Sequence, residues 1–198
     1  TQIENPNLML EGMPNYRSGV DGLRVSNSTK GGITFAASTT QNGIHMITVV
    51  LGVEAVDGDP YARFVATSSL MNYVVRTFVS SIVVKEGDPY GKSKATIMDG
   101  KSETVLAVAK KDFYIVEKQG SQAEPKIQFK SDQESFRAPV KSGTNLGKLH
   151  YTDPDKIGRG YLEDQEPTVD MVAGRTIEKS FFLKVWWNEF VRYVNEKL

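Results

Sequence analysis

The sequence predicts an α+β protein with three parts: an antiparallel three-stranded β-β-β-α unit, a small β-sandwich-like domain and a C-terminal amphipathic helix. Two apolar runs flank an Asn-Gly pair, which is typical of a tight hairpin. A helical period follows over residues 61–79, and short strand-like runs separated by turns fill residues 85–172. With 198 residues the chain can form one large or two small domains. The boundaries predicted from these patterns are 1–82, 85–172 and 176–198.

The composition excludes several classes of site. Lys and Arg number 24 together, as do Asp and Glu, and this balance argues against nucleic acid as a partner. The absence of Cys removes disulfides, thiolate metal sites and Cys nucleophiles, and two His are too few for a multi-His site. We therefore expect no metal and no cofactor. No apolar run is long enough to span a bilayer as a helix. Because the chain begins with Thr1 and not Met, we expect that its natural start was removed.

Three strand-like runs open the chain, at residues 16–25, 33–38 and 44–53. Asn42-Gly43 separates the second from the third and supplies the positive φ angles of a tight turn, which predicts an antiparallel meander. The third run, I-H-M-I-T-V-V-L-G-V, is β-branched and almost wholly apolar, so we expect a strand buried on both faces.

A helix is predicted from Tyr61 to Val79, because apolar residues recur there at spacings of three and four. Asp59 is a candidate N-cap, and Pro60 suits the first helical position.

Short strands alternate with turns in the next region. After a strand that ends near Val84, the candidates are Thr104–Val108, Phe113–Glu117, Lys126–Phe129, Ala138–Val140, Asn145–Tyr151, Ile157–Leu162 and Thr168–Val172. The turn signals are Asp99-Gly100, Gln119-Gly120, Ser142-Gly143 and Asp153-Pro154. Regular short strands without a helical stretch indicate a small β-sandwich.

The last segment, Thr176–Leu198, predicts a helix with Thr176 as its N-cap. One face carries an apolar stripe, which we predict to bind a membrane surface: Leu183, Trp186, Trp187, Phe190, Val191 and Val194. Lys179, Lys184, Arg192 and Lys197 can meet anionic headgroups. Packing of this stripe against the protein's own core is the alternative.

The chain is poor in catalytic motifs. It has no G-x-S-x-G elbow, no P-loop and no H-E-x-x-H. His45 and His150 both lie in predicted strands and are interpreted as ordinary sheet histidines. The acidic pairs Glu163-Asp164 and Asp153/Asp155 are interpreted as solvated turns.

Residues 12–32 contain a more specific pattern: G-M-P-N-Y, then S-G-V-D-G-L, then R-V-S, and K-G-G before a strand. It resembles the third active-site strand of the serine D-alanyl-D-alanine carboxypeptidases, the low-molecular-mass penicillin-binding proteins, where the run is V-D-G-x-K-T-G. The strand at 44–51 and the P-Y-A-R-F helix start at 60–64 resemble the closing β-β-α of that family, and residues 85–172 resemble its C-terminal β domain. The terminal W-W-N-E-F-V-R-Y-V-N-E-K-L resembles the membrane-associating tail of streptococcal members.

The resemblance covers essentially the whole chain and corresponds to the C-terminal half of such a protein. It implies that residues 1–82 are the remnant of a transpeptidase-like domain from the third-motif strand onward. It also implies a role in peptidoglycan maturation at the outer face of the cell membrane. The partners expected from it are the membrane surface and peptidoglycan or cell-wall proteins. Self-association is also expected, because the apolar strand at 44–53 would lack the strands and helices that cover it in the family.

Two departures from the family pattern bear on activity. No Ser is followed by Lys three residues later, so the S-x-x-K nucleophile motif is absent. The G-V-D-G-L frame fixes the register, and Lys-Thr-Gly becomes Arg24-Val25-Ser26. In the family the Lys provides charge near the nucleophile, the Thr hydroxyl binds the substrate carboxylate, and the Gly allows close approach. Arg24 keeps the charge on a bulkier fork, Val25 has no hydroxyl, and Ser26 adds a side chain.

We therefore predict no catalytic residue in this chain and a degenerate third motif. Three interpretations stay open: a truncated or degenerate, inactive carboxypeptidase relative; the C-terminal portion of an active serine-type carboxypeptidase; and a non-catalytic cell-surface scaffold or binding module. These interpretations differ in whether the chain is part of an enzyme.

Overall fold

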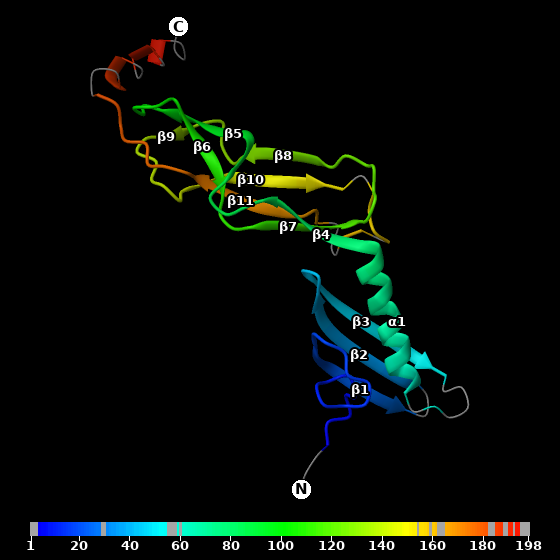
Figure 1. The fold of residues 1–198 in the computed structure, drawn as a ribbon. Helices are drawn as coiled ribbons and strands as arrows, with labels where there is room; N and C mark the ends of the chain where they lie inside the picture. The colour runs from blue at the N-terminus through cyan, green and yellow to red at the C-terminus, as the bar shows by residue number, and fades with distance from the viewer. Residues whose placement is uncertain are drawn as a thin grey trace. The chain divides into compact units, whose positions relative to one another are not determined.

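The structure is a computed structural model that describes residues 4–28, 31–54, 59, 61–153, 155–158, 160–161, 165–181, 185–187, 190–191 and 193–194 (Figure 1). The chain divides into two compact units. The first comprises residues 1–80 and 116–121, and the second comprises residues 81–115 and 122–198.

The first unit contains the predicted antiparallel meander. Strands β1 (Val20–Ser28), β2 (Gly32–Gln41) and β3 (Ile44–Val53) form a sheet in the order β1-β2-β3. Asn42 and Gly43 have φ angles of 53° and 73°, so the predicted Asn-Gly turn is confirmed. The first strand begins at Val20 and not at residue 16, because Gly19 has a φ of +81°, and a β-carbon at this position would lie 2.8 Å from the Thr40 carbonyl oxygen.

Helix α1 (Ala62–Thr77) lies along one face of this sheet, as Figure 1 shows. The ring of Phe64 packs edge-on against Phe35 with 5.1 Å between centroids. The helix is slightly shorter than predicted, because Phe78 is extended and starts β4 (Phe78–Val84). Asp59 is not the N-cap, which is Tyr61, although its Oδ1 accepts a hydrogen bond from the Tyr61 amide at 2.8 Å. Pro60 lies outside the described residues.

The prediction that residues 44–53 form a strand buried on both faces is wrong. Buried and exposed side chains alternate along β3, and the exposed set includes Ile47 at 63% and Leu51 at 76% exposure. Helix α1 packs on the face that carries Ile44, Met46 and Val50, so only that face joins the core. An almost wholly apolar run can therefore predict burial on both faces of a strand although only one face is covered.

The second unit is built on a six-stranded sheet in the order β8-β10-β11-β6-β5-β9. Its strands are β5 (Pro89–Met98), β6 (Thr104–Ala109), β8 (Lys126–Ser131), β9 (Phe136–Arg137), β10 (Asn145–Thr152) and β11 (Thr168–Ala173). Neighbours are antiparallel except β5 and β9. Strands β4 and β7 (Phe113–Lys118) form a separate pair. One core cluster joins Val84, Phe113 and Ile115 of that pair to residues of the large sheet.

Most strand predictions for this region are confirmed, namely those that became β6, β7, β8, β10 and β11. Strand β5 was not predicted, because a bulge between Pro89 and Lys94 interrupts its alternation. The strand expected at 138–140 is instead β9, and Val140 forms an isolated bridge with Ile177. The described residues of 157–162 form no strand, because Gly158 and Gly160 have φ angles of +57° and +87°.

The helix predicted over Thr176–Leu198 does not begin at Thr176. The Thr176 hydroxyl accepts a hydrogen bond from the Ser142 amide at 3.0 Å, and Ile177 and Lys179 form bridges with Val140 and Gly100. Helical conformation is described at residues 185–187, 190–191 and 193–194. Among the described residues, no helix is both long and apolar enough to cross a membrane.

Candidate functional site

The residues predicted from the sequence as third-motif positions lie on the edge strand β1. In the described part of the chain β1 pairs with β2 alone, which leaves its other edge open. Arg24, Val25 and Ser26 lie opposite Ala36, Phe35 and Thr34. Arg24 and Ser26 are exposed, whereas Val25 is half-buried and packs against the core of the first unit. An open strand edge offers free backbone donors and acceptors to an extended peptide.

Arg63 holds the end of this strand. It lies in the first turn of α1 with 5% of its surface exposed. One guanidinium nitrogen donates to the carbonyls of Ser26 and Thr34, at 3.2 and 3.3 Å, and the other donates to Asn27 Oδ1. The Thr34 hydroxyl also donates to the Ser26 carbonyl, at 3.2 Å. Burial lowers the pKa of Arg63. The carbonyl of the last third-motif position is thus fixed from two sides.

A second arginine fixes the approach to β1. Arg17 donates to Asn72 Oδ1 of α1 at 2.8 Å and to Gln41 Oε1 of β2 at 2.9 Å, and its burial lowers its pKa. Asp21, inside the G-V-D-G-L frame, accepts a hydrogen bond from the Ser38 hydroxyl on β2. Arg17 thus ties the segment before the frame to helix α1 and to β2, and Asp21 ties the frame itself to β2.

Chemically, the third-motif positions present one exposed guanidinium and one exposed hydroxyl on an open strand edge. They can bind and align an anionic or extended ligand, but covalent catalysis also requires an activated nucleophile. Within the described ranges no three His, Cys, Asp or Glu side chains gather as a metal site would require.

The remaining sequence candidates lie apart from β1. His45 is exposed on β3. His150 is half-buried on β10, and burial, with smaller effects of Lys130 and Lys148, lowers its pKa. Asp153 Oδ1 accepts from the Asp155 amide at 2.8 Å in a turn. Glu163 and Asp164 lie outside the described residues.

The residues predicted to bind membrane lie near the C-terminus of the second unit. Trp186 and Trp187 are 61% and 58% exposed, and the Phe190 ring lies 6.0 Å from each of them. Val191 is exposed and Val194 is half-buried. Leu183 lies outside the described residues. The structure therefore presents an aromatic cluster to solvent.

A known family model, "Penicillin-binding protein 5, C-terminal domain", matches residues 78–179, more than half of the chain. The chain belongs to this penicillin-binding protein family. The resemblance found in the sequence is confirmed by this match and by a crystal structure from Streptococcus pneumoniae described as a peptidoglycan synthesis regulatory factor (PBP3). That structure is 45% identical, with a TM-score of 0.83, over 89% of this chain and 48% of its own.

Other relatives of this penicillin-binding protein family are more distant. The D-alanyl-D-alanine carboxypeptidase DacA of Haemophilus influenzae is 26% identical over 67% of this chain and 32% of its own length. Penicillin binding protein 5 from the same species shares the fold with a TM-score of 0.56 at 22% identity, over 81% of this chain and 43% of its own. The chain thus spans a third to a half of the length of the proteins it matches.

Sequence reasoning predicted Arg24, Val25 and Ser26 as third-motif positions and did not single out Arg63 or Arg17. Arg63 left a signal: a basic residue in the first turn of a helix opposes the helix dipole and calls for a specific reason. That reason is the set of carbonyl and amide oxygens that it bonds across β1 and β2.

Proposed function

We propose that this chain is part of a cell-wall protein related to the D-Ala-D-Ala carboxypeptidases, acting in peptidoglycan maturation outside the cytoplasm, and that its third motif no longer supports acyl transfer. Family membership supports the cell-wall role. The observation that carries the loss of acyl transfer is the triplet Arg24-Val25-Ser26 on the open edge of β1.

Val25 lacks the hydroxyl with which the family's Thr binds the substrate carboxylate. A hydrogen bond to a charged carboxylate contributes about 1.5–3 kcal/mol. Losing it lowers the rate of acyl transfer by about tenfold to a hundredfold, since about 1.4 kcal/mol is tenfold. The side chain of Ser26 adds steric cost where the family has Gly, and its carbonyl is fixed by Arg63 and Thr34, so the strand cannot move away to make room.

Penicillin acylation tests the proposal. The longest natural protein that contains this chain is incubated with a penicillin, and the covalent adduct is followed by intact-mass spectrometry. We expect no adduct or slow formation, and at least tenfold faster formation in the variant R24K/V25T/S26G if the protein retains a nucleophile. Thr34→Ser is the matched control, since it keeps the hydroxyl that bonds Ser26. Fast acylation of the unsubstituted protein, at a rate that the triple substitution does not change, would contradict the proposal and favour an active carboxypeptidase.

A second proposal concerns location. We infer that Trp186, Trp187 and Phe190 bind the surface of a membrane, because two exposed indoles beside an exposed phenyl ring suit the headgroup boundary. Lys179 flanks this cluster in the sequence and can meet anionic headgroups.

Co-sedimentation with anionic vesicles tests this second proposal. We expect W186S/W187S to bind about tenfold more weakly, because an indole buried at the interface contributes less than the roughly 1.5–3 kcal/mol of full burial. Tyr114→Ser removes an exposed aromatic from β7 and should bind as the unsubstituted chain does. Equal binding by all three would leave the aromatic cluster a structural feature only.

A further inference from the structure

A hollow of about 380 Å³ lies on the outer face of the six-stranded sheet. Along β6 the side chains of Val105, Ala107 and Ala109 are buried, so Thr104, Leu106 and Val108 point the other way. These outward residues line the hollow, and Leu106 is 53% exposed. Its floor is therefore apolar although it opens to solvent.

Two features of the backbone create this space. On β5, Pro89 pairs with Val108 and Lys94 pairs with Leu106. Five residue steps along β5 therefore lie opposite only two along β6, and β5 bulges there. Opposite, Gly174 donates its amide to the Leu106 carbonyl at 3.0 Å. A β-carbon on Gly174 would lie 3.0 Å from Val108 Cγ1, so glycine keeps this wall open.

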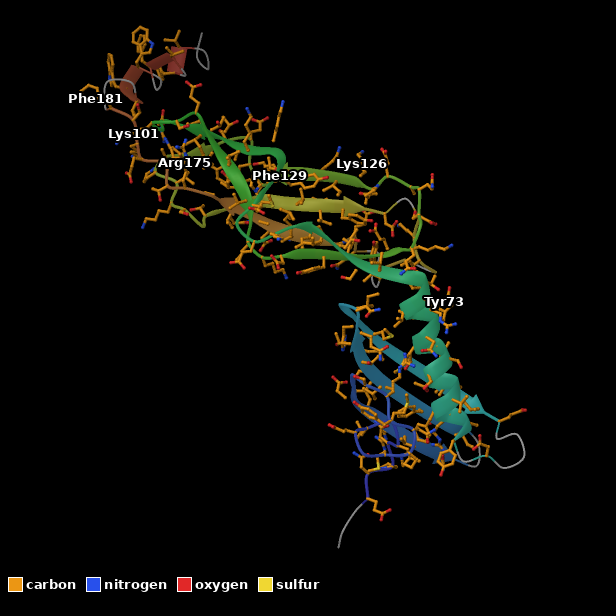
Figure 2. All side chains as sticks on the ribbon, viewed as in Figure 1. Tyr73, Lys101, Lys126, Phe129, Arg175 and Phe181 are labelled. Atoms are coloured by element: carbon orange, nitrogen blue, oxygen red, sulfur yellow. The ribbon has the colours of Figure 1, made fainter. Side chains whose placement is uncertain are left out.

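A second hollow of about 420 Å³ adjoins the first and shares Ser102 and Arg175 with it. The Ser102 hydroxyl donates to the Thr104 carbonyl at 2.8 Å and accepts from Arg175 at 3.5 Å. These two hydrogen bonds hold the Arg175 guanidinium between the two hollows. Figure 2 shows Arg175 and Lys101, which lines the second hollow, at the same end of the sheet, away from Lys126.

The charge of the site is predominantly positive. Lys94, Lys101 and Arg175 line the two hollows, and among the described lining residues Glu178 is the one acidic side chain. Within the described ranges the salt bridges are Lys110–Asp170 and Arg137–Asp99, so none of these three cations is in an ion pair there. Lys94 on β5 thus lines the first hollow, Lys101 in the β5–β6 turn lines the second, and Arg175 after β11 lines both.

We propose that this double hollow binds a phosphate group carried on a small carbon scaffold, such as a polyol or sugar phosphate. A tetrahedral phosphate accepts from donors in several directions, which suits one guanidinium fork and two ammonium groups on different segments. A planar carboxylate would use the Arg175 fork and leave the lysines unpaired. The Leu106 and Val108 floor covers the carbon scaffold. This inference is independent of the acylation proposal, since it uses no residue of the first unit.

Titration of the full chain with glycerol 3-phosphate, followed by amide NMR shifts, tests the proposal. We expect shifts at Leu106, Gly174 and Arg175 that saturate and that weaken at high salt, with none for glycerol. Arg175→Gln and Lys94→Gln should each raise Kd about five- to tenfold. Lys118→Gln, on β7, removes the same charge away from the hollows and should leave Kd unchanged. Shifts absent from these amides, or equal weakening by all three variants, would overturn the proposal.

A second arm identifies the source of the phosphate, which is either a soluble phosphate ester or a lipid headgroup. Arg175→Gln and Lys94→Gln are compared in co-sedimentation with phosphatidylglycerol vesicles, in the W186S/W187S background that removes the aromatic contribution. Loss of vesicle binding in parallel with loss of glycerol 3-phosphate binding assigns the site to a headgroup. Unchanged vesicle binding assigns it to a soluble ester. Both results support the site, whereas retained glycerol 3-phosphate affinity in both variants contradicts it.

Discussion

Replacement of Arg63 should release the third-motif strand from helix α1. Arg63→Gln removes the guanidinium, which makes three hydrogen bonds to Ser26, Thr34 and Asn27. At about 1 kcal/mol net for each bond, and with one bond retained by the shorter amide, we expect a loss of about 2 kcal/mol in the free energy of unfolding of the first unit. For a unit of this size that corresponds to a fall of roughly 8–16 °C in Tm.

Hydrogen exchange and calorimetry measure this effect. Exchange is followed by mass spectrometry in peptides that cover β1, since two units need not unfold as one transition. Arg76→Gln is the matched control: it lies exposed in the last turn of the same helix, where its loss costs only about 0.3–1 kcal/mol. Equal losses in the two variants, or unchanged exchange across β1, would refute the view that Arg63 anchors the strand.

Three more predictions follow from single sites. Gly147 has a φ of 147°, and a β-carbon there would lie 2.1 Å from the Lys130 carbonyl oxygen. Gly147→Ala should therefore lower the free energy of unfolding by about 3 kcal/mol or more, whereas Gly120→Ala in an open turn should lower it by about 1 kcal/mol. Urea unfolding of the two variants measures the difference. The 198-residue chain should self-associate through the exposed face of β3, which carries Ile47 and Leu51. The double variant Ile47→Lys, Leu51→Lys should shift the sedimentation coefficient toward that of a monomer. An unsubstituted chain that stays monomeric at high concentration contradicts this prediction. The pKa of His150 is lowered in the folded state, so the native state binds fewer protons than the unfolded chain as the pH falls through 6.5, and stability decreases there. His150→Gln should therefore weaken the dependence of Tm on pH between pH 7 and 5. An unchanged dependence would exclude this role of His150.

Local chemistry explains which parts of the fold the sequence predicted. Asn42-Gly43 and Asp99 adopt positive φ angles that few other residues accept, so the turns could be located from residue type alone. The alternation of β11 is regular, and its prediction is confirmed to within one residue. The G-V-D-G-L frame likewise located Arg24, Val25 and Ser26 on β1 because register within a strand is fixed by counting.

The errors arise where a distant segment decides the local structure. Whether one or both faces of β3 are covered depends on α1 and not on the strand's own residues. The extended course of Ile177 depends on its bridge to Val140, nearly forty positions earlier, which overrides a helical pattern. Arg63 acquires its role only when α1 meets the ends of β1 and β2, which no spacing along the chain reveals.

The division of the chain has a consequence for synthesis. Residues 116–121 belong with the first 80 residues, and the Gln119 amide donates to the Thr77 carbonyl at 2.8 Å. A ribosome that has made the whole β1–α1 region has not yet made this last piece of the same unit. The first unit therefore gains its last segment only after strands β5 and β6 of the second have been synthesised, although domains ordinarily complete in chain order. Nascent chains halted between residues 85 and 115 should hold the core of the first unit without its last segment, and the Thr77 carbonyl should lack the amide of Gln119.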